Sequence, residues 1–233
     1  MGRIVLESVI VEVEPTGIVA GPATFTVEPG EAVMVVGPNG AGKTSLLKAI
    51  AGIYRVSSGR LEVKGKPAYV PQSDMLLPWL TIAENIALPL TLRGASKEEA
   101  LAKVRMLAAR LGLEEHLDKL PREASGGTRR KAAVARGLIQ GADVLLLDEP
   151  FTGVDAASIA ALKDMLMELK ESGISMVIVT HQVHVVASFA DAAVLLYPPP
   201  DGVVDVVELK GLGPGERFRV AEHLLRRLSN RGG

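Results

Sequence analysis

The chain has 233 residues, of which 48% are hydrophobic and 23% are charged, and its formal net charge of -1 argues against a general affinity for nucleic acid or anionic lipid. The absence of cysteine excludes disulfides, thiol catalysis and thiolate-bound metals. Residues Met1–Pro15 alternate like a strand, so we expect no signal peptide. No apolar run approaches the ~18 residues that a membrane span needs.

The first seventy residues are rich in Val, Ile and Thr between turn residues, which predicts strands at Ile4–Val13, Ala23–Val27 and Ala32–Val36. A helix is expected directly after the third strand, at Gly42–Ala51. We expect two further strands, Arg60–Val63 and Ala68–Val70, to form a pair around the turn Lys64–Lys66.

From Leu80 to about Gln140 the apolar residues recur at helical spacing. Ser96, followed closely by acidic residues, predicts the start of one helix, and Gly112 predicts its end. This part of the chain is therefore expected to form a helical lobe.

After Gln140, short apolar strands alternate with helices. The expected elements are strand Asp143–Leu147, helix Ala156–Glu171, strand Ser175–Thr180, helix Val183–Phe189, strand Ala193–Leu196, strand Val203–Leu209 and a basic terminal helix. Buried strands joined by helices predict an α/β fold with a parallel sheet covered on both faces. We expect a core at 1–72 and 141–197, an inserted lobe at about 73–140, and an extension at 198–233.

The loop after strand Ala32–Val36 matches the phosphate-binding pattern G-x-x-x-x-G-K-[ST]. The expected phosphate-binding residues are Gly37, Pro38, Asn39, Gly40, Ala41, Gly42, Lys43, Thr44 and Ser45. Glycines let the backbone curl around phosphates, and the helix N-terminus supplies further N–H groups. Lys43 should reach the β- and γ-phosphates, and Thr44 should bind Mg²⁺.

An apolar strand ends in Asp148 and Glu149, at the edge of a sheet where ligands bind. Asp148 would hold Mg²⁺ through water, and Glu149 would polarise the attacking water. Upstream, Ser125, Gly126 and Gly127 begin a helix and form a second potential anion site.

These segments together resemble the ATP-binding cassette (ABC) ATPases from about Ile4 to Tyr197. The motifs that carry the resemblance, besides the phosphate-binding loop, are Tyr69–Gln72, Ala124–Thr128, Asp148–Pro150, Thr152–Asp155 and Val179–His181. The resemblance implies a P-loop NTPase core with a parallel sheet, an antiparallel β subdomain and an inserted helical signature subdomain. It also implies ATP hydrolysis with Mg²⁺.

The resemblance further implies roles for single residues. Gln72 would sense Mg²⁺ and the γ-phosphate, and His181 would hold the γ-phosphate and the attacking water. Ser125–Gly127 would close over ATP held by a second ABC ATPase subunit, in a homodimer or heterodimer, and Asp155 would connect the two sites.

Two departures from the family pattern stand out. The signature has Ala124 and Thr128 where the family usually has Leu and Gln. In addition, the family commonly stacks adenine on an aromatic residue, whose place falls near Val13 or Glu14, and no aromatic residue precedes Phe25. We therefore expect weaker and less base-selective nucleotide binding.

The segment Leu76–Thr81 follows Gln72 and contains the only tryptophan, Trp79. A bulky aromatic residue there either docks a permease helix or anchors the helical lobe. The segment resembles ATPase subunits of nitrate, sulfonate and taurine importers. This implies transmembrane permease subunits, a solute-binding protein in the complex, and a location on the cytoplasmic face of the membrane.

Two alternative functions stay open, an exporter ATPase and a cytosolic assembly factor for iron–sulfur clusters, and the resemblance does not identify the solute. Among the remaining polar residues, Arg129, Arg130 and Lys131 are expected to form a solvated helix face or a partner contact. His184 is expected to be an ordinary helix residue, and no transition-metal site is expected.

Overall fold

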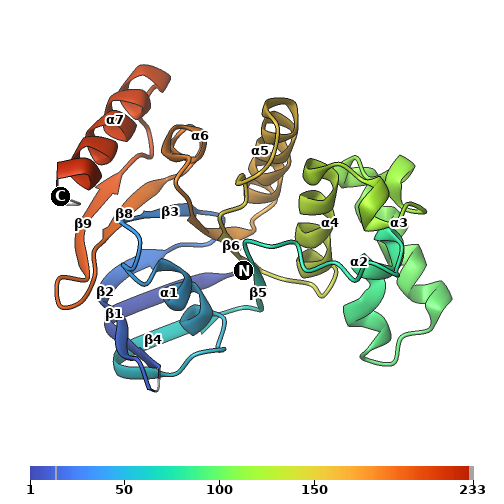
Figure 1. Cartoon of the computed structure of the whole chain (residues 1–233), viewed down its shortest axis with the longest axis horizontal. Helices are drawn as coiled ribbons and strands as arrows, with labels where there is room; N and C mark the ends of the chain where they lie inside the picture. Colours follow the sequence, from blue (N-terminus) through green and yellow to red (C-terminus); the bar gives the residue numbers. More distant parts are fainter. Residues whose placement is uncertain (14, 231–233) are drawn as a thin grey trace.

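The computed structural model describes residues 1–13 and 15–230, which form two sheets and a separate group of helices (Figure 1). The smaller sheet is antiparallel, in the order β2-β1-β4. Its strands are β1 (Arg3–Val13), β2 (Gly17–Val27) and β4 (Val56–Lys64). This sheet is the expected antiparallel β subdomain.

The larger sheet has the order β5-β6-β7-β3-β8-β9. Its strands are β3 (Ala32–Val36), β5 (Pro67–Val70), β6 (Val144–Asp148), β7 (Ser175–Val179), β8 (Ala192–Leu196) and β9 (Val203–Glu208). The first five in spatial order are parallel, and β9 pairs antiparallel with β8. Every residue of β3, β6 and β7 is buried, as expected for strands covered on both faces.

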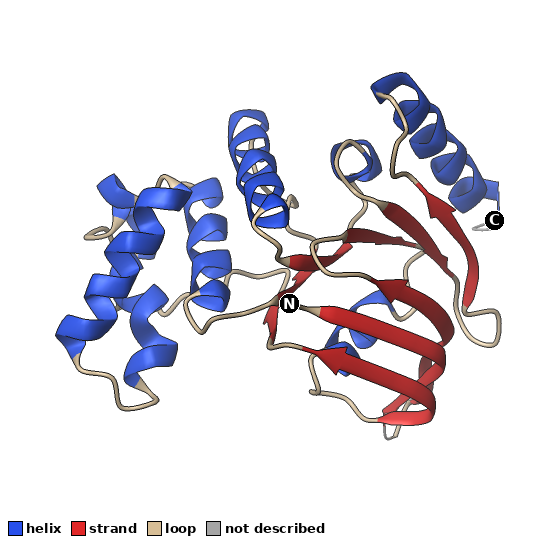
Figure 2. Cartoon of the chain, turned by 180° about the vertical axis from the view of Figure 1, so that it is seen from behind, coloured by secondary structure: helices blue, strands red, loops and turns tan. Residues whose placement is uncertain are grey.

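Alternate side chains of the larger sheet enter two different cores. On one face, Val35 and its equivalents pack with helix α1 (Lys43–Ile50) and the antiparallel sheet. On the other face, Met34 and its equivalents pack with three helices. These are α5 (Ala156–Glu171), α6 (Val183–Ala187) and α7 (Pro214–Asn230), which Figure 2 shows on the opposite side of the sheet from the antiparallel strands.

The expected helical lobe contains α2 (Ile82–Thr91), α3 (Lys97–Leu111) and α4 (Gly126–Leu138) with two short 3₁₀ turns, Glu114–His116 and Pro121–Glu123. In Figure 1 it lies beside the sheets, with α4 nearest to them. The predicted boundaries of α3 are confirmed: the side chain of Ser96 caps its start, and Gly112 ends it with a left-handed backbone at φ 61°.

The predicted pairing of two strands around Lys64–Lys66 is wrong. The first of these strands, β4, pairs with β1, whereas the second, β5, runs parallel to β6 at the edge of the larger sheet. Gly65 has φ +93° and packs closely on Asp143, whose carboxylate accepts a 2.9 Å hydrogen bond from Lys66 N. This turn therefore passes the chain from one sheet to the other.

The C-terminal extension packs on the rest of the molecule through β9 and α7, and Leu209, Ala221 and Leu224 are fully buried. His184 of α6 contacts α7: its Nε2 lies 3.0 Å from Glu222 Oε1, and its ring stacks on Phe218. Across the described residues, the helices all lack the length or the apolar character needed to cross a membrane.

Candidate nucleotide-binding and catalytic site

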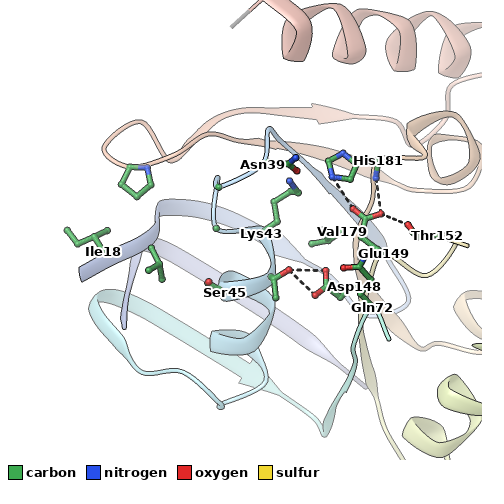
Figure 3. A pocket seen from close by; sticks show the side chains of 15 residues that line it. Ile18, Asn39, Lys43, Ser45, Gln72, Asp148, Glu149, Thr152, Val179 and His181 are labelled. Atoms are coloured by element: carbon green, nitrogen blue, oxygen red, sulfur yellow. Dashed lines mark hydrogen bonds and ion pairs between the residues drawn. The ribbon is translucent and has the colours of Figure 1, made fainter. Parts of the chain in front are cut away.

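A cavity of about 610 Å³ lies where β3, β6 and β7 end and α1 begins. Figure 3 shows the side chains that converge there. The lining residues are Ile18, Val19, Asn39, Gly40, Gly42, Lys43, Thr44, Ser45, Gln72, Asp148, Glu149, Thr152, Val179, His181 and Pro199.

The phosphate-binding loop connects β3 to α1. A side chain at Gly37 would collide with the backbone of Leu196, so the loop can lie this close to β8 only with glycine. Gly42 begins α1 with φ +84° and provides no side-chain cap. The first N–H groups of α1 are therefore available to an anion.

Lys43 folds back over this loop, and its Nζ donates to the carbonyls of Gly37 at 2.7 Å and Pro38 at 2.9 Å. Burial lowers the pKa of Lys43, and the nearby carboxylates of Glu149 and Asp148 oppose that shift. A buried ammonium with only carbonyl partners has charge to offer to a phosphate.

The hydroxyl of Thr44 donates to Asp148, with Oγ1 2.9 and 3.1 Å from the two carboxylate oxygens. Tyr69 also donates to Asp148 Oδ2, at 3.0 Å. Burial and Asp148 raise the pKa of Tyr69, which keeps its hydroxyl protonated as a donor. Hydroxyl and carboxylate oxygens suit Mg²⁺, which usually binds one or two carboxylates together with substrate phosphates.

Glu149 follows β6 with a left-handed backbone at φ 47° and a side chain that is almost fully buried. Its Oε2 accepts hydrogen bonds from Thr152 Oγ1 and from His181 N, both at 3.2 Å. Its Oε1 lies 3.4 Å from His181 Nε2 and is, among the described residues, the buried side-chain polar atom that has no hydrogen bond. This oxygen faces the imidazole of His181 and, unlike Oε2, accepts no hydrogen bond.

The structure brings most of the predicted site residues together in this cavity: Asn39, Gly40, Gly42, Lys43, Thr44, Ser45, Gln72, Asp148, Glu149 and His181. Gly37, Pro38 and Ala41 belong to the same loop but do not line it.

The predicted signature residues and Asp155 lie elsewhere. Ser125 caps α4 by accepting from Thr128 N at 3.1 Å, and Ser125 and Gly127 line a separate cavity of about 240 Å³. Asp155 caps α5, and hydrogen bonds from Ser158 lower its pKa. The roles assigned to these residues need a second subunit and stay predictions.

The expectation of a solvated Arg129–Lys131 face is wrong for Arg130, which is 2% exposed. Its guanidinium donates to backbone carbonyls rather than to solvent. A signal for this exists in the sequence, because Gly127, Arg130 and Gly137 share one face of α4 with Ala133 and Val134, which pack on the core.

Sequence reasoning also missed the residues at the far end of the cavity from Glu149, where Figure 3 places Ile18. Ile18, Val19 and Pro199 line the cavity, which has no aromatic residue among its lining side chains. The family's adenine-stacking aromatic residue was expected to correspond to Val13 or Glu14. Val13 is not part of the cavity lining, and Glu14 lies outside the described residues. Nothing in the sequence marks Pro199, which follows β8 in the chain.

Trp79 is 70% exposed, so it is not a buried anchor of the helical lobe. A groove of about 250 Å³ lies between the lobe and the core. Its lining includes Ile53, Tyr69, Pro89 and Arg136.

Comparison with known proteins identifies relatives along most of the chain. Residues 21–152 match the family model described as "ABC transporter". The chain is 32% identical to a taurine import ATP-binding protein of Pseudomonas aeruginosa, over 88% of the chain and 82% of the relative. It is 34% identical to an aliphatic sulfonates import ATP-binding protein of Xanthomonas axonopodis, over 81% and 79%.

Solved structures give a consistent result. The post-hydrolysis dimer of the ATP-binding cassette MJ0796 bound to ADP and Pi aligns with a TM-score of 0.77 and 26% identity, and covers 90% of this chain and 100% of that chain. A second dimeric structure of the same cassette, described as a bacterial ABC transporter cassette, aligns with the same TM-score and 25% identity.

Proposed function

Because the chain belongs to the ABC transporter family, we propose that it is the ATP-hydrolysing subunit of an importer. One observation carries the hydrolytic part of the proposal. The carboxylate of Glu149 enters the same cavity as Lys43 and the start of α1, with one oxygen held by two donors and the other free. The cavity thus combines a site for phosphate with a carboxylate that can act as the base for the attacking water.

The phosphates of ATP bind over Gly37–Ser45, where the N–H groups of α1 and Lys43 meet their charge. Thr44 and Asp148 hold Mg²⁺, with Gln72 as a further oxygen ligand in the cavity. The cation supplies charge neutralisation at the β- and γ-phosphates. Tyr69 orients Asp148 through its hydrogen bond.

Glu149 accepts a proton from the attacking water at the free oxygen of its carboxylate. Thr152 and the backbone of His181 fix the other oxygen, so the carboxylate keeps its orientation. The side chain of His181 is about half exposed and contacts the γ-phosphate and the water.

The site is completed by a second ABC ATPase subunit. Ser125–Gly127 and Asp155 are outside the cavity of their own chain, which supports a role over the nucleotide of a partner. Two solved structures of the cassette MJ0796, which has this fold, are described as dimeric, and one of them is bound to ADP and Pi.

The groove between core and lobe receives a helix of a transmembrane permease. Trp79, which is exposed, contributes an aromatic contact to the permease. These partners place the subunit on the cytoplasmic face of a membrane, in a complex with a solute-binding protein. The relatives described above are import ATP-binding proteins for taurine and aliphatic sulfonates, which favours import over the exporter and assembly-factor alternatives.

The proposal is tested with Glu149→Gln, which keeps the shape of the side chain but removes the base. We expect ATP turnover to fall by about 10²–10⁴-fold, while ATP traps a stable dimer that light scattering detects. Lys43→Ala is the control and should lose hydrolysis without forming the dimer. A folded Glu149→Gln protein that turns over ATP normally, or that stays monomeric at saturating ATP, contradicts the proposal.

A further inference from the structure

The guanidinium of Arg130 is buried and joins two segments that are far apart in the sequence. Its Nε donates to Pro150 O at 3.1 Å and its Nη2 to Asp148 O at 2.7 Å. Its Nη1 donates to Pro71 O at 2.5 Å and to Gln72 O at 3.1 Å. The planar fork of an arginine can make all four contacts at once, which no other side chain can do.

The first pair of carbonyls lies on either side of Glu149. Glu149 itself has φ +47°, a backbone conformation that non-glycine residues adopt only when their surroundings impose it. The bonds from Arg130 to the residue before and the residue after Glu149 hold this turn, and so set the direction of the carboxylate.

The second pair of carbonyls belongs to the loop that carries Gln72 into the cavity. Asp74 in the same loop lies 3.4 Å from the Arg130 guanidinium, and Arg129 also pairs with Asp74 at 3.5 Å. The carboxylate of Asp74 offsets the charge of the buried arginine. Arg130 therefore fixes Gln72 through the backbone and leaves its side chain exposed to the cavity.

Arg130 belongs to α4, the helix that Ser125 caps. Because a helix moves as a rigid body over this short distance, any displacement of the N-terminus of α4 moves the guanidinium and the carbonyls bonded to it. One buried side chain thus connects the signature end of α4 with the backbone of two cavity residues.

We propose that Arg130 is a positioning residue for hydrolysis, which makes the placement of Glu149 and Gln72 depend on the position of α4. This inference rests on the proposed role of Glu149 as the base and goes beyond it. When Ser125–Gly127 close onto the nucleotide of a partner subunit, Arg130 is the contact that transmits the movement of α4 to the carboxylate of Glu149.

The test is Arg130→Lys, which keeps the charge and most of the volume but cannot reach both segments. We expect kcat for ATP to fall about 10- to 100-fold while KM and the Kd for ATP change less than about twofold, because the cavity that binds ATP is unchanged. Arg217→Lys is the matched control: Arg217 of α7 also donates to three backbone carbonyls, those of Leu212, Ala187 and Ala190, and none of these residues lines the nucleotide cavity.

The melting temperature of each variant shows whether it is folded, and a double-mutant cycle tests the route of the effect. In a Glu149→Gln background, Arg130→Lys should lower the residual rate by a clearly smaller factor than it lowers the rate of the unmodified chain, because the carboxylate is already gone and only the hold on Gln72 is lost. An equal loss in both backgrounds overturns the proposal. So does an unchanged kcat in a folded Arg130→Lys, or an equal loss of kcat in Arg217→Lys.

Failure of the proposed function has a different result. In that case the unmodified chain does not hydrolyse ATP, or Lys43→Ala hydrolyses it as well as the unmodified chain does. If the unmodified chain hydrolyses ATP, Lys43→Ala does not, and Arg130→Lys equals the unmodified chain, the ATPase stands and the positioning role is wrong.

Discussion

Asp148 and Glu149 are neighbours in the sequence, yet their carboxylates have different partners. Asp148 ends the buried strand β6 and accepts from Thr44 and Tyr69. The left-handed backbone of Glu149 turns the next carboxylate toward Thr152 and His181. These partners suit Asp148 to binding a cation and Glu149 to the role of the base.

A first prediction at this scale concerns Tyr69→Phe, which removes one donor to Asp148 and little volume. We expect the Mg²⁺ concentration for half-maximal ATPase activity to rise about 10-fold, because partners of metal ligands typically influence affinity to this extent. Magnesium titration of the ATPase rate measures it. A Tyr54→Phe variant, whose ring belongs to the antiparallel-sheet side of the core, is the control. An unchanged magnesium requirement would show that Tyr69 does not support the cation site.

The second prediction concerns the base of the nucleotide. Because Ile18, Val19 and Pro199 offer apolar contact and no aromatic stacking partner, we expect ATP and GTP to bind with Kd values within about threefold of each other. Isothermal titration calorimetry measures both. The aromatic ring introduced by Ile18→Tyr should strengthen the binding of both ATP and GTP by about 1 kcal/mol. A strong preference of the unmodified chain for ATP would be evidence against this account.

Most of the predicted cavity residues lie in a local motif, either a loop before a helix or an acid after an apolar strand, whereas Gln72 and His181 were expected from the family resemblance. Arg130 escapes such motif-based reasoning because its partners are backbone carbonyls, and only its place on a buried face of α4 marks it in the sequence. Ile18 and Pro199 escape it because only the packing of distant segments brings them into one cavity.

At the scale of elements, the two helix N-termini expected to bind anions differ. Helix α1 begins at a glycine without a side-chain cap, whereas Ser125 caps α4 through a hydrogen bond to Thr128 N. The N-terminus of α1 is ready for phosphate within the single chain. We expect the N-terminus of α4 to bind a phosphate only when the nucleotide site of a second subunit lies against it.

Helix α2 gives a prediction about pH. Hydrogen bonding from the backbone of Thr81 is the largest cause of the lowered pKa of Glu84, which completes the capping box. A carboxylate with a lowered pKa stabilises the folded state above its unfolded value, near pH 4.3, and loses this contribution as pH falls through the folded value.

Glu84→Gln keeps an acceptor for the cap but carries no charge. We expect it to lower the stability of the folded chain by less than about 1 kcal/mol at pH 7, and the difference from the unmodified chain to vanish toward pH 3. Urea denaturation at several pH values measures this. A constant difference from pH 7 to pH 3 would show that the charge of Glu84 is not the cause.

Element boundaries were predictable where capping residues mark them, as at Ser96 and Gly112. The mistaken strand pair shows the limit. A Gly in a short turn between two strand-like segments normally predicts a hairpin. Here the partner of β5 is β6, whose residues come more than seventy positions later, and local sequence does not encode such a pairing.

At the scale of the whole molecule, the exposed Trp79 predicts a separation between hydrolysis and coupling. We expect Trp79→Ala to leave the ATPase rate of the isolated chain unchanged within about twofold, and to weaken binding to the permease by about 2 kcal/mol or more. Binding to detergent-solubilised permease measures the second effect. Met106→Ala is a matched control, because Met106 is a similarly exposed apolar residue of the lobe but belongs to α3, outside the segment Leu76–Thr81 that contains Trp79. Equal binding by both variants would exclude Trp79 from the docking surface.

The α/β class and the inserted lobe were predictable because alternation of strands and helices is a property of long segments, whereas the antiparallel subdomain was expected from the family resemblance. The order of the strands in the larger sheet and the attachment of the C-terminal extension were not. They depend on contacts such as that of His184 with Glu222, between residues that have no motif.

One of the two cores extends without interruption from Val104 in the lobe, through Leu162 of α5, to Leu224 of α7. The lobe and the extension thus share their interior with the sheet. A chain cut after Tyr197 would lack β9 and α7. The apolar surface that these two elements cover would then be exposed to water and would promote aggregation. On heating, the intact protein should accordingly lose its structure in a single cooperative transition, rather than shed its parts one at a time.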